Sequence, residues 1–597
     1  MQPLDILRER YGYDAFRPPQ DTIISRVIAG QHACVIMPTG GGKSLCYQIP
    51  ALCREGVGIV VSPLIALMQD QVAALHQLDI RAAAIHSGLE PAEREASLRA
   101  LREGNIDILY VAPERLVMPE FMSMLKHCNI ALFAIDEAHC MSQWGHDFRP
   151  DYAALSQLVE AFPNVPRIAL TATADAPTRR DICRQLAIEE DATFICGFDR
   201  PNIHYSIAPR AAVKQRIVEL LRETHAGQSG IIYCMSRKKV EELTDWLKAQ
   251  GVHALAYHAG MDASARAKNQ ERFLRDEAVV MVATIAFGMG IDKPDVRFVM
   301  HTQIPKNIEA YYQETGRAGR DGMPARAYLW YGMDDVVQLR RWIDESDAGD
   351  AQKRIEHQKL QSLIGLCETA QCRRQVLLRY FDQHSQACGH CDTCDQPPEG
   401  FDATIAAQKL LSCVYRSGQR FGLHYIVELL TGSQSEKILA RRHDQLSTYG
   451  IGEEYSRQEW LQIGRQLVTL GLLHVDAQGH GGLALSEQGT AFLREKQPLQ
   501  LRKQATRKPR ASRSASVAEH LPDAARGLFA TLKHRRAELA KTHNVPAYVI
   551  FHDKTLEEMA RQRPQEREAM LAISGIGATK YERYGEAFLE ILKSDAA

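Results

Sequence analysis

The chain has 597 residues, which is too long for one hydrophobic core and predicts about four domains. Hydrophobic residues make up 45% and charged residues 24%, and the formal net charge of −1 provides no overall attraction to a polyanion. A polar N-terminus and the lack of any run of roughly twenty apolar residues argue against a signal peptide and a membrane span. Most of the fourteen cysteines are dispersed in apolar segments, as expected in a reducing cytoplasm.

Short apolar strands alternate with longer helical stretches over residues 1–335, which is typical of parallel α/β layers. The strands expected first are Ala33–Met37, Gly58–Val61, Asp107–Val111, Ala131–Ile135 and Arg167–Thr171. A second series after Arg200-Pro201-Asn202 has expected strands at Gly230–Cys234, Val252–Tyr257, Val279–Ala283 and Arg297–His301. Two sheets in succession predict two similar lobes, residues 1–200 and 201–335, with a cleft between them.

A glycine-rich segment lies between the first expected strand and a helix that starts near Lys43. It consists of Pro38, Thr39, Gly40, Gly41, Gly42, Lys43 and Ser44. Its glycines let backbone N–H groups face phosphates, Lys43 can reach the β- and γ-phosphates, and Ser44 can ligate Mg²⁺. Met37 occupies the position where the usual pattern has a glycine, but the segment still predicts a phosphate-binding loop.

The acidic segment Asp136-Glu137-Ala138-His139 follows the expected strand Ala131–Ile135. Asp136 is placed to hold Mg²⁺, and Glu137 is placed to activate the attacking water. Either motif alone could be a glycine-rich turn or an unrelated acidic strand end. Both motifs in this order predict a nucleoside triphosphatase.

Four cysteines with tight spacing lie in residues 336–400, which otherwise look helical. Cys372, Cys388, Cys391 and Cys394 suit tetrahedral zinc, although four free thiols are the alternative. Cys367 is a rival ligand, but its place in an apolar helix favours the core. The arginines on the adjoining helix could touch phosphates or form a solvated face; they are Arg373, Arg374 and Arg379.

Three further regions follow the boundary at Pro397–Gly400. Residues 401–500 mix helices with a short hairpin, in which Gly471–Val475 is an expected strand and Asp476–Gly482 an expected tip. Residues 501–518 are basic and poor in apolar side chains, which predicts a flexible linker. Residues 519–597 are expected to form a small helical domain.

Further motifs appear in order along the chain, namely Ser62–Leu67, Thr171–Ala174, Thr284–Lys293 and Gln313–Gly322. Together with the phosphate loop and the acidic segment, they resemble the bacterial RecQ family of superfamily 2 DNA helicases over essentially the whole chain. The resemblance implies two tandem RecA-like lobes with parallel sheets, a zinc-binding helical domain, a winged-helix domain and a C-terminal helical HRDC domain. It also implies ATP-dependent unwinding of DNA with 3′-to-5′ movement.

The segment before the first strand resembles the adenine-reading motif of this family. A glutamine amide can pair with adenine and an aromatic ring can stack on it, so the resemblance gives these roles to Tyr13, Arg17 and Gln20. The alternative is an N-terminal helix packed through Phe16.

Residues Gly316–Arg320 should place Arg317 and Arg320 on one face of a helix. Such arginines stabilise charge that develops on the γ-phosphate, and by resemblance Arg320 is the better candidate for this arginine finger. The alternative is a solvated basic helix. Asp292 and Gln313 are expected to face the same cleft.

The segment after the acidic motif resembles the aromatic-rich loop of the family. Its candidate DNA-binding residues are Trp144, His146, Phe148 and Arg149. Exposed aromatic rings can stack on unpaired bases, whereas core packing of Trp144 and Phe148 is the alternative. His139 and His146 could relay DNA contact to hydrolysis.

Two weaker DNA-binding candidates lie further on. His480 falls at the expected hairpin tip, which could prise apart the duplex or be a plain exposed turn. Tyr548 could stack on a base beside Lys533, Arg535 and Arg536, and the alternative is that it is buried. Ser574–Gly577 could be a phosphate-holding turn or a tight helix connection.

The resemblance implies ATP, Mg²⁺ and Zn²⁺ as cofactors and single- and double-stranded DNA as partners. It also implies the single-stranded-DNA-binding protein as a partner of the winged-helix domain, and a cytoplasmic, nucleoid-associated role in recombination and repair. An RNA helicase of the same superfamily and a DNA-binding scaffold with vestigial hydrolysis are the rival functions. The zinc, winged-helix and HRDC segments favour DNA over RNA.

Overall fold

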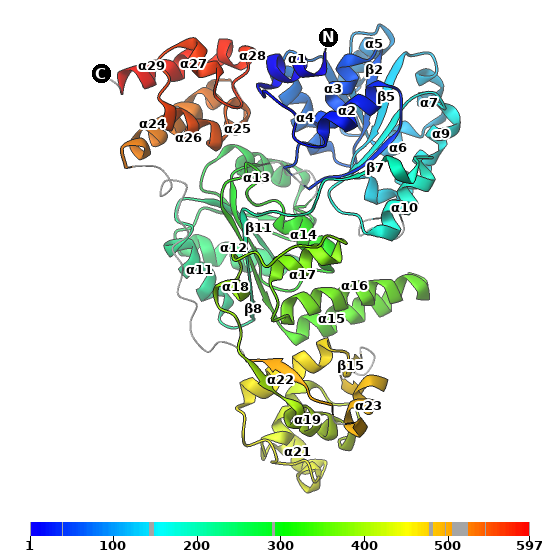
Figure 1. The fold of residues 1–597 in the computed structure, drawn as a ribbon, viewed down its shortest axis with the longest axis vertical. Coiled ribbons are helices and arrows are strands. Elements are labelled where there is room, and N and C mark those ends of the chain that lie inside the picture. The colour runs from blue at the N-terminus through cyan, green and yellow to red at the C-terminus, as the bar shows by residue number, and fades with distance from the viewer. Residues whose placement is uncertain are drawn as a thin grey trace.

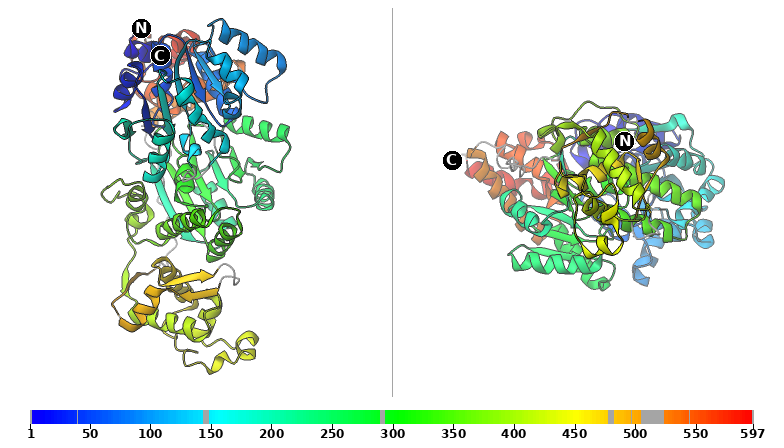
Figure 2. Two further views of the ribbon diagram at one scale, coloured as in Figure 1. Left: turned by 90° about the vertical axis from the view of Figure 1, so that its right-hand side faces the viewer. Right: turned by 90° about the horizontal axis from the view of Figure 1, so that it is seen from below.

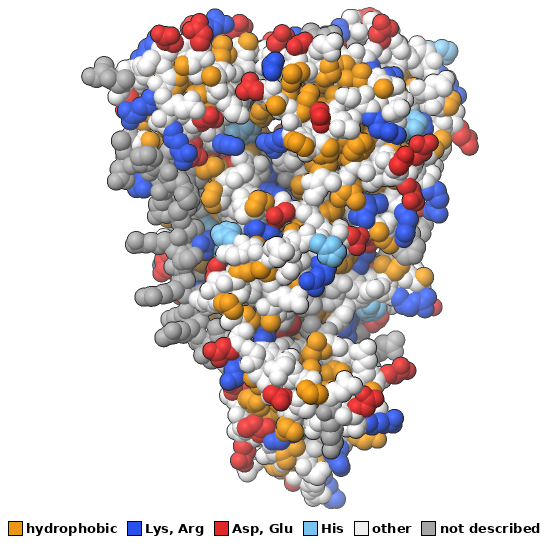
Figure 3. Space-filling model, viewed as in Figure 1, with side chains coloured by type: hydrophobic (Ala, Val, Ile, Leu, Met, Phe, Trp, Pro, Cys, Tyr) orange, Lys and Arg blue, Asp and Glu red, His pale blue; other side chains and the backbone are white. Residues whose placement is uncertain are grey.

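The computed structural model describes residues 2–595 except residues 39, 143–147, 289–292, 477–481, 496, 504–522 and 544. Two sheet-containing lobes follow one another along the long axis, the winged-helix region lies at one end, and the C-terminal helices lie beside the first lobe (Figures 1 and 2). Acidic and basic side chains are interspersed over the face in Figure 3, in keeping with the near-zero net charge.

The first lobe is built on a seven-stranded parallel sheet of order β3-β4-β2-β5-β6-β1-β7. Alternate residues of each buried strand enter two different cores, as Val35 and Ile36 do in β1. The strands are β1 (Ala33–Ile36), β2 (Val57–Val61), β3 (Ala82–Ile85), β4 (Ile108–Val111), β5 (Ile130–Ile135), β6 (Arg167–Thr171) and β7 (Thr193–Ile195). The helices are α1 (Pro3–Ile6), α2 (Gln20–Ile28), α3 (Leu45–Cys53), α4 (Ile65–Gln77), α5 (Pro91–Arg102), α6 (Pro113–Leu116), α7 (Pro119–Leu125), α8 (Pro150–Ala153), α9 (Gln157–Ala161) and α10 (Ala176–Gln185).

The second lobe has a six-stranded parallel sheet of order β10-β11-β9-β12-β13-β8. Its strands are β8 (Ile203–Pro209), β9 (Ser229–Tyr233), β10 (Ala254–Tyr257), β11 (Val280–Ala283), β12 (Val296–His301) and β13 (Ala325–Tyr331). Its helices are α11 (Val213–Glu223), α12 (Arg237–Ala249), α13 (Ala263–Arg275) and α14 (Ile308–Thr315). The prediction of two lobes with parallel sheets is therefore confirmed.

All the strands expected from the sequence are present, with ends shifted by at most two residues. The sequence analysis did not identify β3, β7, β8 and β13. In β3 the run Ala82-Ala83-Ala84 carries weak strand propensity, and β7 has only three residues.

The segment after the second lobe joins both lobes. It consists of α15 (Met333–Glu345), α16 (Asp350–Glu368), α17 (Arg373–Tyr380) and α18 (Asp392–Asp395). On α16, the buried Lys359 ammonium lies 2.7 Å from Glu309 Oε1 of the second lobe and 3.7 Å from Asp175 Oδ2 of the first. The phenyl ring of Phe198, between the lobes, stacks on Phe381 with a centroid separation of 4.4 Å.

The winged-helix region has a core of its own around the fully buried Trp460, whose indole N–H donates to the Gly452 carbonyl at 2.8 Å. Its helices are α19 (Thr404–Arg416), α20 (Leu423–Leu430), α21 (Glu436–Ala440), α22 (Arg457–Thr469) and α23 (Glu487–Glu495). The expected hairpin is formed by β15 (Leu473–Asp476) and β16 (Gly482–Leu485), which are antiparallel. The expected linker starts too early, because β17 (Gln500–Arg502) pairs with β14 (Gly400–Asp402) and buries Leu501.

The C-terminal helices enclose a separate apolar core that includes Leu532, Phe551 and Phe588. They are α24 (Asp523–Thr542), α25 (Ala547–Ile550), α26 (Asp553–Gln562), α27 (Arg567–Leu571), α28 (Ala578–Lys580) and α29 (Glu586–Ser594). Among the helices of the described residues, none is both long and apolar enough to cross a membrane.

Candidate active site and zinc centre

The carboxyl end of the first sheet opens into a cavity of about 420 Å³ between the lobes. The phosphate loop follows β1 and the acidic motif follows β5, so both reach this edge of the sheet. The predicted site residues that line the cavity are Tyr13, Arg17, Gln20, Gly40, Gly42, Lys43, Ser44, Asp136, Glu137, Gln313, Arg317 and Arg320. Thr39 and Asp292 lie outside the described residues.

The phosphate loop depends on glycines at two positions. Gly40 and Gly42 have φ of +82° and +87°, in the left-handed region. A Cβ on Gly42 would lie 2.5 Å from Gln20 Nε2, and one on Gly40 would lie 3.0 Å from the Arg320 carbonyl oxygen of the second lobe. The close approach that glycine allows therefore brings the candidate finger loop against the phosphate loop.

Lys43 and Ser44 lie directly before α3, where the helix dipole favours an anion. The Lys43 ammonium donates to the Met37 carbonyl at 3.0 Å, and Gly41 N–H donates to the Pro38 carbonyl at 3.0 Å. These contacts close the loop on itself. Since an ammonium has three N–H donors, Lys43 can bind a nucleotide phosphate while it keeps this contact with the Met37 carbonyl.

The segment before β1 is tied to the phosphate loop by hydrogen bonds. Gln20 Oε1 accepts from Arg17 N–H at 2.9 Å, and Gln20 Nε2 donates to the Gly41 and Gly42 carbonyls at 3.2 and 3.1 Å. Tyr13 and Phe16 both pack on the small cluster around Ile24. Phe16 therefore packs as the alternative expected. The adenine-reading role of Tyr13, Arg17 and Gln20 stays a prediction.

Two carboxyl groups meet at the end of β5. Glu137 has φ of +49°, a strained conformation of the kind found at functional sites, and its N–H donates to Asp136 Oδ1 at 3.0 Å. Burial and the neighbouring Glu137 carboxylate raise the pKa of Asp136 to about 7. A divalent cation would relieve this repulsion, so the donor set fits Mg²⁺ held by Asp136 and Ser44.

His139 links the acidic motif to the end of β6. Its Nδ1 lies 2.8 Å from Thr171 Oγ1 and 3.3 Å from Glu137 Oε2. Burial opposes a charged ring, but the Cys140 thiol and the Glu137 carboxylate outweigh it and raise the pKa of His139 to about 10. The geometry suits a relay at His139, whereas the other relay candidate, His146, lies outside the described residues.

The second lobe contributes its arginines from a turn, so the expected helix over Gly316–Arg320 is wrong. Helix α14 ends at Thr315, and Gly319 has φ of +58°. Side chains of Arg200 and Asn202 hold this turn. The Arg200 guanidinium donates to the Gly316, Ala318 and Gly319 carbonyls at 2.9, 2.7 and 2.9 Å, and Asn202 Nδ2 donates to the Gly319 and Met323 carbonyls at 2.8 and 2.9 Å.

Arg200 and Asn202 are positioning residues that the sequence analysis treated only as a boundary. In the sequence, the sign of this positioning role was that both residues stand directly before the second series of expected strands. Arg200 lies more than a hundred residues from the turn it holds, so spacing alone could not connect the two.

The aromatic-rich loop is described only at its end. Trp144 and His146 lie outside the described residues. The Phe148 side chain is exposed, which excludes core packing for this residue, and the Arg149 guanidinium donates to the Pro63 carbonyl at 3.3 Å. The DNA-binding role of both residues stays a prediction.

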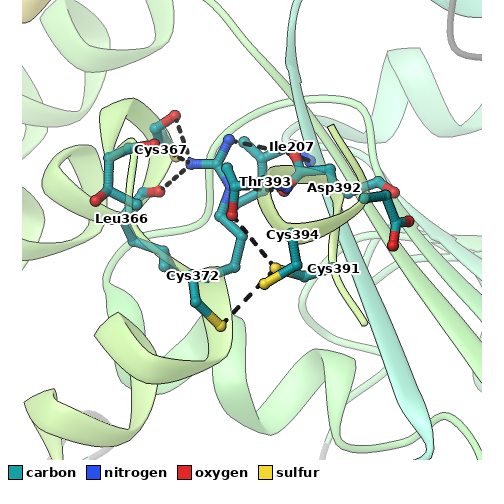
Figure 4. A network of polar contacts seen from close by, with 12 residues as sticks. Ile207, Leu366, Cys367, Cys372, Cys391, Asp392, Thr393 and Cys394 are labelled. Atoms are coloured by element: carbon teal, nitrogen blue, oxygen red, sulfur yellow. Dashed lines mark hydrogen bonds and ion pairs between the residues drawn. The ribbon is translucent and has the colours of Figure 1, made fainter. Parts of the chain in front are cut away.

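The four predicted zinc ligands come together. The sulfurs of Cys372, Cys388, Cys391 and Cys394 all lie within 4.8 Å of one another (Figure 4). The Cys372–Cys391 and Cys388–Cys394 sulfur separations are both 3.9 Å. Tetrahedral zinc with bonds of about 2.3 Å requires sulfurs about 3.8 Å apart, so the cluster fits the ion.

Backbone donors prepare one thiol for metal binding. Burial acts to raise the pKa of Cys372, but N–H groups of Cys388 and Gln375 outweigh it and lower the pKa to about 7. Their distances to Cys372 Sγ are 3.3 and 3.5 Å. Cys367, the rival ligand, is fully buried in the apolar core and is not part of the cluster.

Both readings of Arg373 and Arg374 as phosphate-binding or solvated residues are wrong, because the two side chains are buried. Arg373 Nε donates to Asp392 Oδ1 at 2.9 Å, and its NH1 donates to the Leu366 carbonyl at 2.6 Å. Asp392 Oδ2 also accepts from Ile207 N–H of β8 at 2.8 Å. This network, drawn in Figure 4, fixes the cysteine segment to the second lobe.

The remaining predicted residues belong to the winged-helix region and the C-terminal helices. His480 lies outside the described residues. Tyr548 is half-buried, and its side chain lines the cavity between the lobes. In the turn Ser574–Gly577, Gly575 N–H donates to the Gly12 carbonyl at 3.0 Å, which makes it a packing contact here.

Replacing Arg373 should loosen the zinc centre. In Arg373→Met, Asp392 loses its buried partner, and we expect zinc transfer to a chromogenic chelator to accelerate about tenfold. Arg379→Met, an exposed change on the same helix, is the matched control. Equal release from both variants would contradict the bracing role.

Replacing Arg200 should misplace the arginine turn. Because a small displacement of a catalytic group can cost about 100-fold in rate, we expect Arg200→Met to lower kcat for hydrolysis by about that factor. Binding of a fluorescent diphosphate nucleotide should change far less. Arg222→Met, an exposed change on α11, serves as the control, and an unchanged kcat in Arg200→Met would refute the positioning role.

The affinity for Mg²⁺ should depend on pH. Since the pKa of Asp136 without metal is about 7, the proton and the metal compete below that pH. We expect the Mg²⁺ concentration for half-maximal hydrolysis to rise about tenfold for each unit of pH below about 7 and to level off above it. Titrating Mg²⁺ at several pH values measures this, and a flat response would contradict the raised pKa.

Family models match the chain in the same order as its structural regions. They are the DEAD/DEAH box helicase at residues 17–182, the helicase conserved C-terminal domain at 212–322, the RecQ zinc-binding model at 333–395, the RQC domain at 397–510 and the HRDC domain at 525–592.

Full-length relatives are also similar to this chain. The ATP-dependent DNA helicase RecQ of Pasteurella multocida is 45% identical, with the match covering 99% of this chain and 93% of the relative. The proteins of the same name from Haemophilus influenzae and Bacillus subtilis are 42% and 39% identical, covering 100% and 99% of this chain and 96% and 98% of the relatives. With ATP, Mg²⁺ and Zn²⁺ as its cofactors, this chain belongs to the RecQ family of ATP-dependent DNA helicases.

Proposed function

We propose that this chain couples ATP hydrolysis to 3′-to-5′ movement along one DNA strand, and so unwinds duplex DNA in recombination and repair. The observation that carries the proposal is the cavity lined by the phosphate loop and Asp136 from one lobe and by Arg317 and Arg320 from the other. Because the site is complete only when the lobes meet, hydrolysis depends on lobe closure, and its products favour reopening.

Each chemical role falls to a group at the cavity. Lys43 holds the phosphates, Ser44 and Asp136 hold Mg²⁺, and Glu137 orients and activates the attacking water. The metal, when bound, offsets charge on the phosphates. Tyr13, Arg17 and Gln20 would hold the adenine, and Gln313 and Asp292 would complete the cleft.

Arg320 supplies charge stabilisation from the second lobe, with Arg317 beside it. Its backbone lies against Gly40, so its guanidinium needs no large loop movement to reach the γ-phosphate. The buried environment of Arg317, whose side chain is 3% exposed, speaks against the alternative of a solvated basic helix.

The bound strand would contact the segment that leads out of the acidic motif. Phe148 is exposed only eleven residues after Glu137, so stacking on a base could shift the backbone that holds Glu137. Trp144, His146 and Arg149 would share this contact. His480 at the hairpin tip and Tyr548 are the further proposed DNA contacts.

We propose a cytoplasmic, nucleoid-associated site of action, on the family resemblance. We also propose the single-stranded-DNA-binding protein as a partner of the winged-helix region, on the family resemblance. Arg420 and Arg441 guanidiniums lie 5.4 and 5.5 Å from the Phe421 ring centroid there, which offers a cationic and aromatic contact.

The rival functions make different predictions. An RNA helicase would hydrolyse ATP faster with single-stranded RNA than with DNA. A scaffold with vestigial hydrolysis would retain its cellular role in Lys43→Ala.

Strand separation on a partial duplex tests the proposal. With MgATP, we expect separation only from a 3′ single-stranded tail, and Glu137→Gln should lower the rate by about 100-fold or more because it removes a general base. Glu160→Gln, an exposed change on α9, is the matched control. If the chain hydrolysed ATP but separated the strands of neither substrate, the helicase proposal would fail. A translocase or a nucleotide-dependent switch would then be the remaining function.

A further inference from the structure

The C-terminal helices α24 to α29, hereafter the lid, form one wall of the nucleotide cavity. Figure 1 shows them beside the first lobe and next to the second. The lid residues that line the cavity are Tyr548, His552, Lys554, Thr555, Ser574 and Gly575. The proposed site therefore has walls from three parts of the chain, and the lining residues of the third part follow the phosphate loop by more than 500 residues.

The lid contacts the first lobe through backbone and side chains. Gly575 N–H donates to the Gly12 carbonyl at 3.0 Å, and a Cβ on Gly12 would lie 2.4 Å from Gly577 N. The Tyr584 hydroxyl and Arg583 NH1 donate to Gln77 Oε1 at 2.9 and 3.0 Å. Arg583 also forms an ion pair with Asp79.

The lid contacts the second lobe mainly through charge. Lys533 Nζ and Arg536 NH2 each lie 3.6 Å from a carboxylate oxygen of Glu277. Arg536 is itself held inside the lid by Asp553 at 2.7 Å and by the Phe551 carbonyl. Glu277 is 42% exposed at its side chain, so water screens these pairs. The first-lobe contact has an exposed ion pair too, but it also has the close backbone packing of Gly12 on Gly577, which does not depend on charge.

A domain that bridges both walls of a cleft resists changes in the opening of that cleft. We propose that the lid holds bound nucleotide in the cavity, and that nucleotide exchange requires the lid to leave the second lobe while it stays on the first. This inference rests on the proposed function, because it takes the cavity to be the nucleotide site.

The docked face of the lid also carries residues predicted to bind DNA. Lys533 pairs with the second lobe, and Tyr548 faces the cavity. The lid therefore cannot dock on the lobes and bind a DNA strand through the same face at the same time. A strand captured by the lid would free the nucleotide site, which links exchange to the presence of DNA.

Release of a fluorescent N-methylanthraniloyl-ADP from the full chain, chased with unlabelled MgATP, tests the lid. Lys533→Glu places two carboxylates together at the second-lobe tie, and Arg583→Ala weakens the first-lobe tie. Because coupling between sites is typically worth fivefold or more, we expect release to accelerate about fivefold in Lys533→Glu and to change far less in Arg583→Ala, since the lid stays on the first lobe during exchange. Glu277→Gln, which removes the carboxylate that Lys533 and Arg536 share, should also accelerate release.

Lys593→Glu makes the same charge reversal at an exposed position of α29 and should leave release unchanged. Unchanged or slower release in both Lys533→Glu and Glu277→Gln, with folding verified by circular dichroism, would overturn the lid. Acceleration in Arg583→Ala as large as in Lys533→Glu would contradict detachment from the second lobe alone. If the wild-type chain failed to bind the nucleotide at all, the proposed function would fail instead, before the lid is tested.

Discussion

The parallel register of the first sheet is the constraint on which the rest of the molecule depends. Parallel strands all present their carboxyl ends at one edge, so the loops after β1, β5 and β6 converge although β1 ends at Ile36 and β6 at Thr171. The inserted β6 brings Thr171 between the phosphate loop and the acidic motif. His139 can therefore touch Glu137 and Thr171 at once.

The carboxyl edge of the first sheet supplies only one half of the active site. The second lobe has to supply the other half. The turn that bears Arg317 and Arg320 has short-range backbone hydrogen bonds, such as the one from Ala318 N–H to the Thr315 carbonyl at 3.0 Å. The side chains of the buried Arg200 and the half-buried Asn202 satisfy further carbonyls of this turn, since an unsatisfied buried carbonyl would be costly. The start of the second lobe thus sets the geometry of its catalytic turn.

Contacts on opposite sides of the molecule tie the two lobes to each other. On one side, Lys359 of α16 lies between Asp175 and Glu309, and the zinc segment packs through Phe381 on Phe198. On the other side, the lid spans the cleft. The first set combines buried charges with an apolar ring stack, whereas the second-lobe tie of the lid is partly exposed and charged. We therefore expect the cleft between the lobes to open more easily on the side of the lid.

The sequence by itself determined what depends on neighbours along the chain. Apolar runs predicted β1, β5 and β6 nearly to the residue, and cysteine spacing predicted a cluster that fits zinc, because strand burial and short chelate loops are local properties. Only the tertiary structure decided features that rest on distant contacts. The turn at Gly319 replaced an expected helix because Asn202 requires a close approach, and Arg373 is a buried brace because Asp392 faces it. The lid could not be read from periodicity, since it meets the first lobe through Gly12 and Gly577, and no local pattern records contacts between residues so far apart.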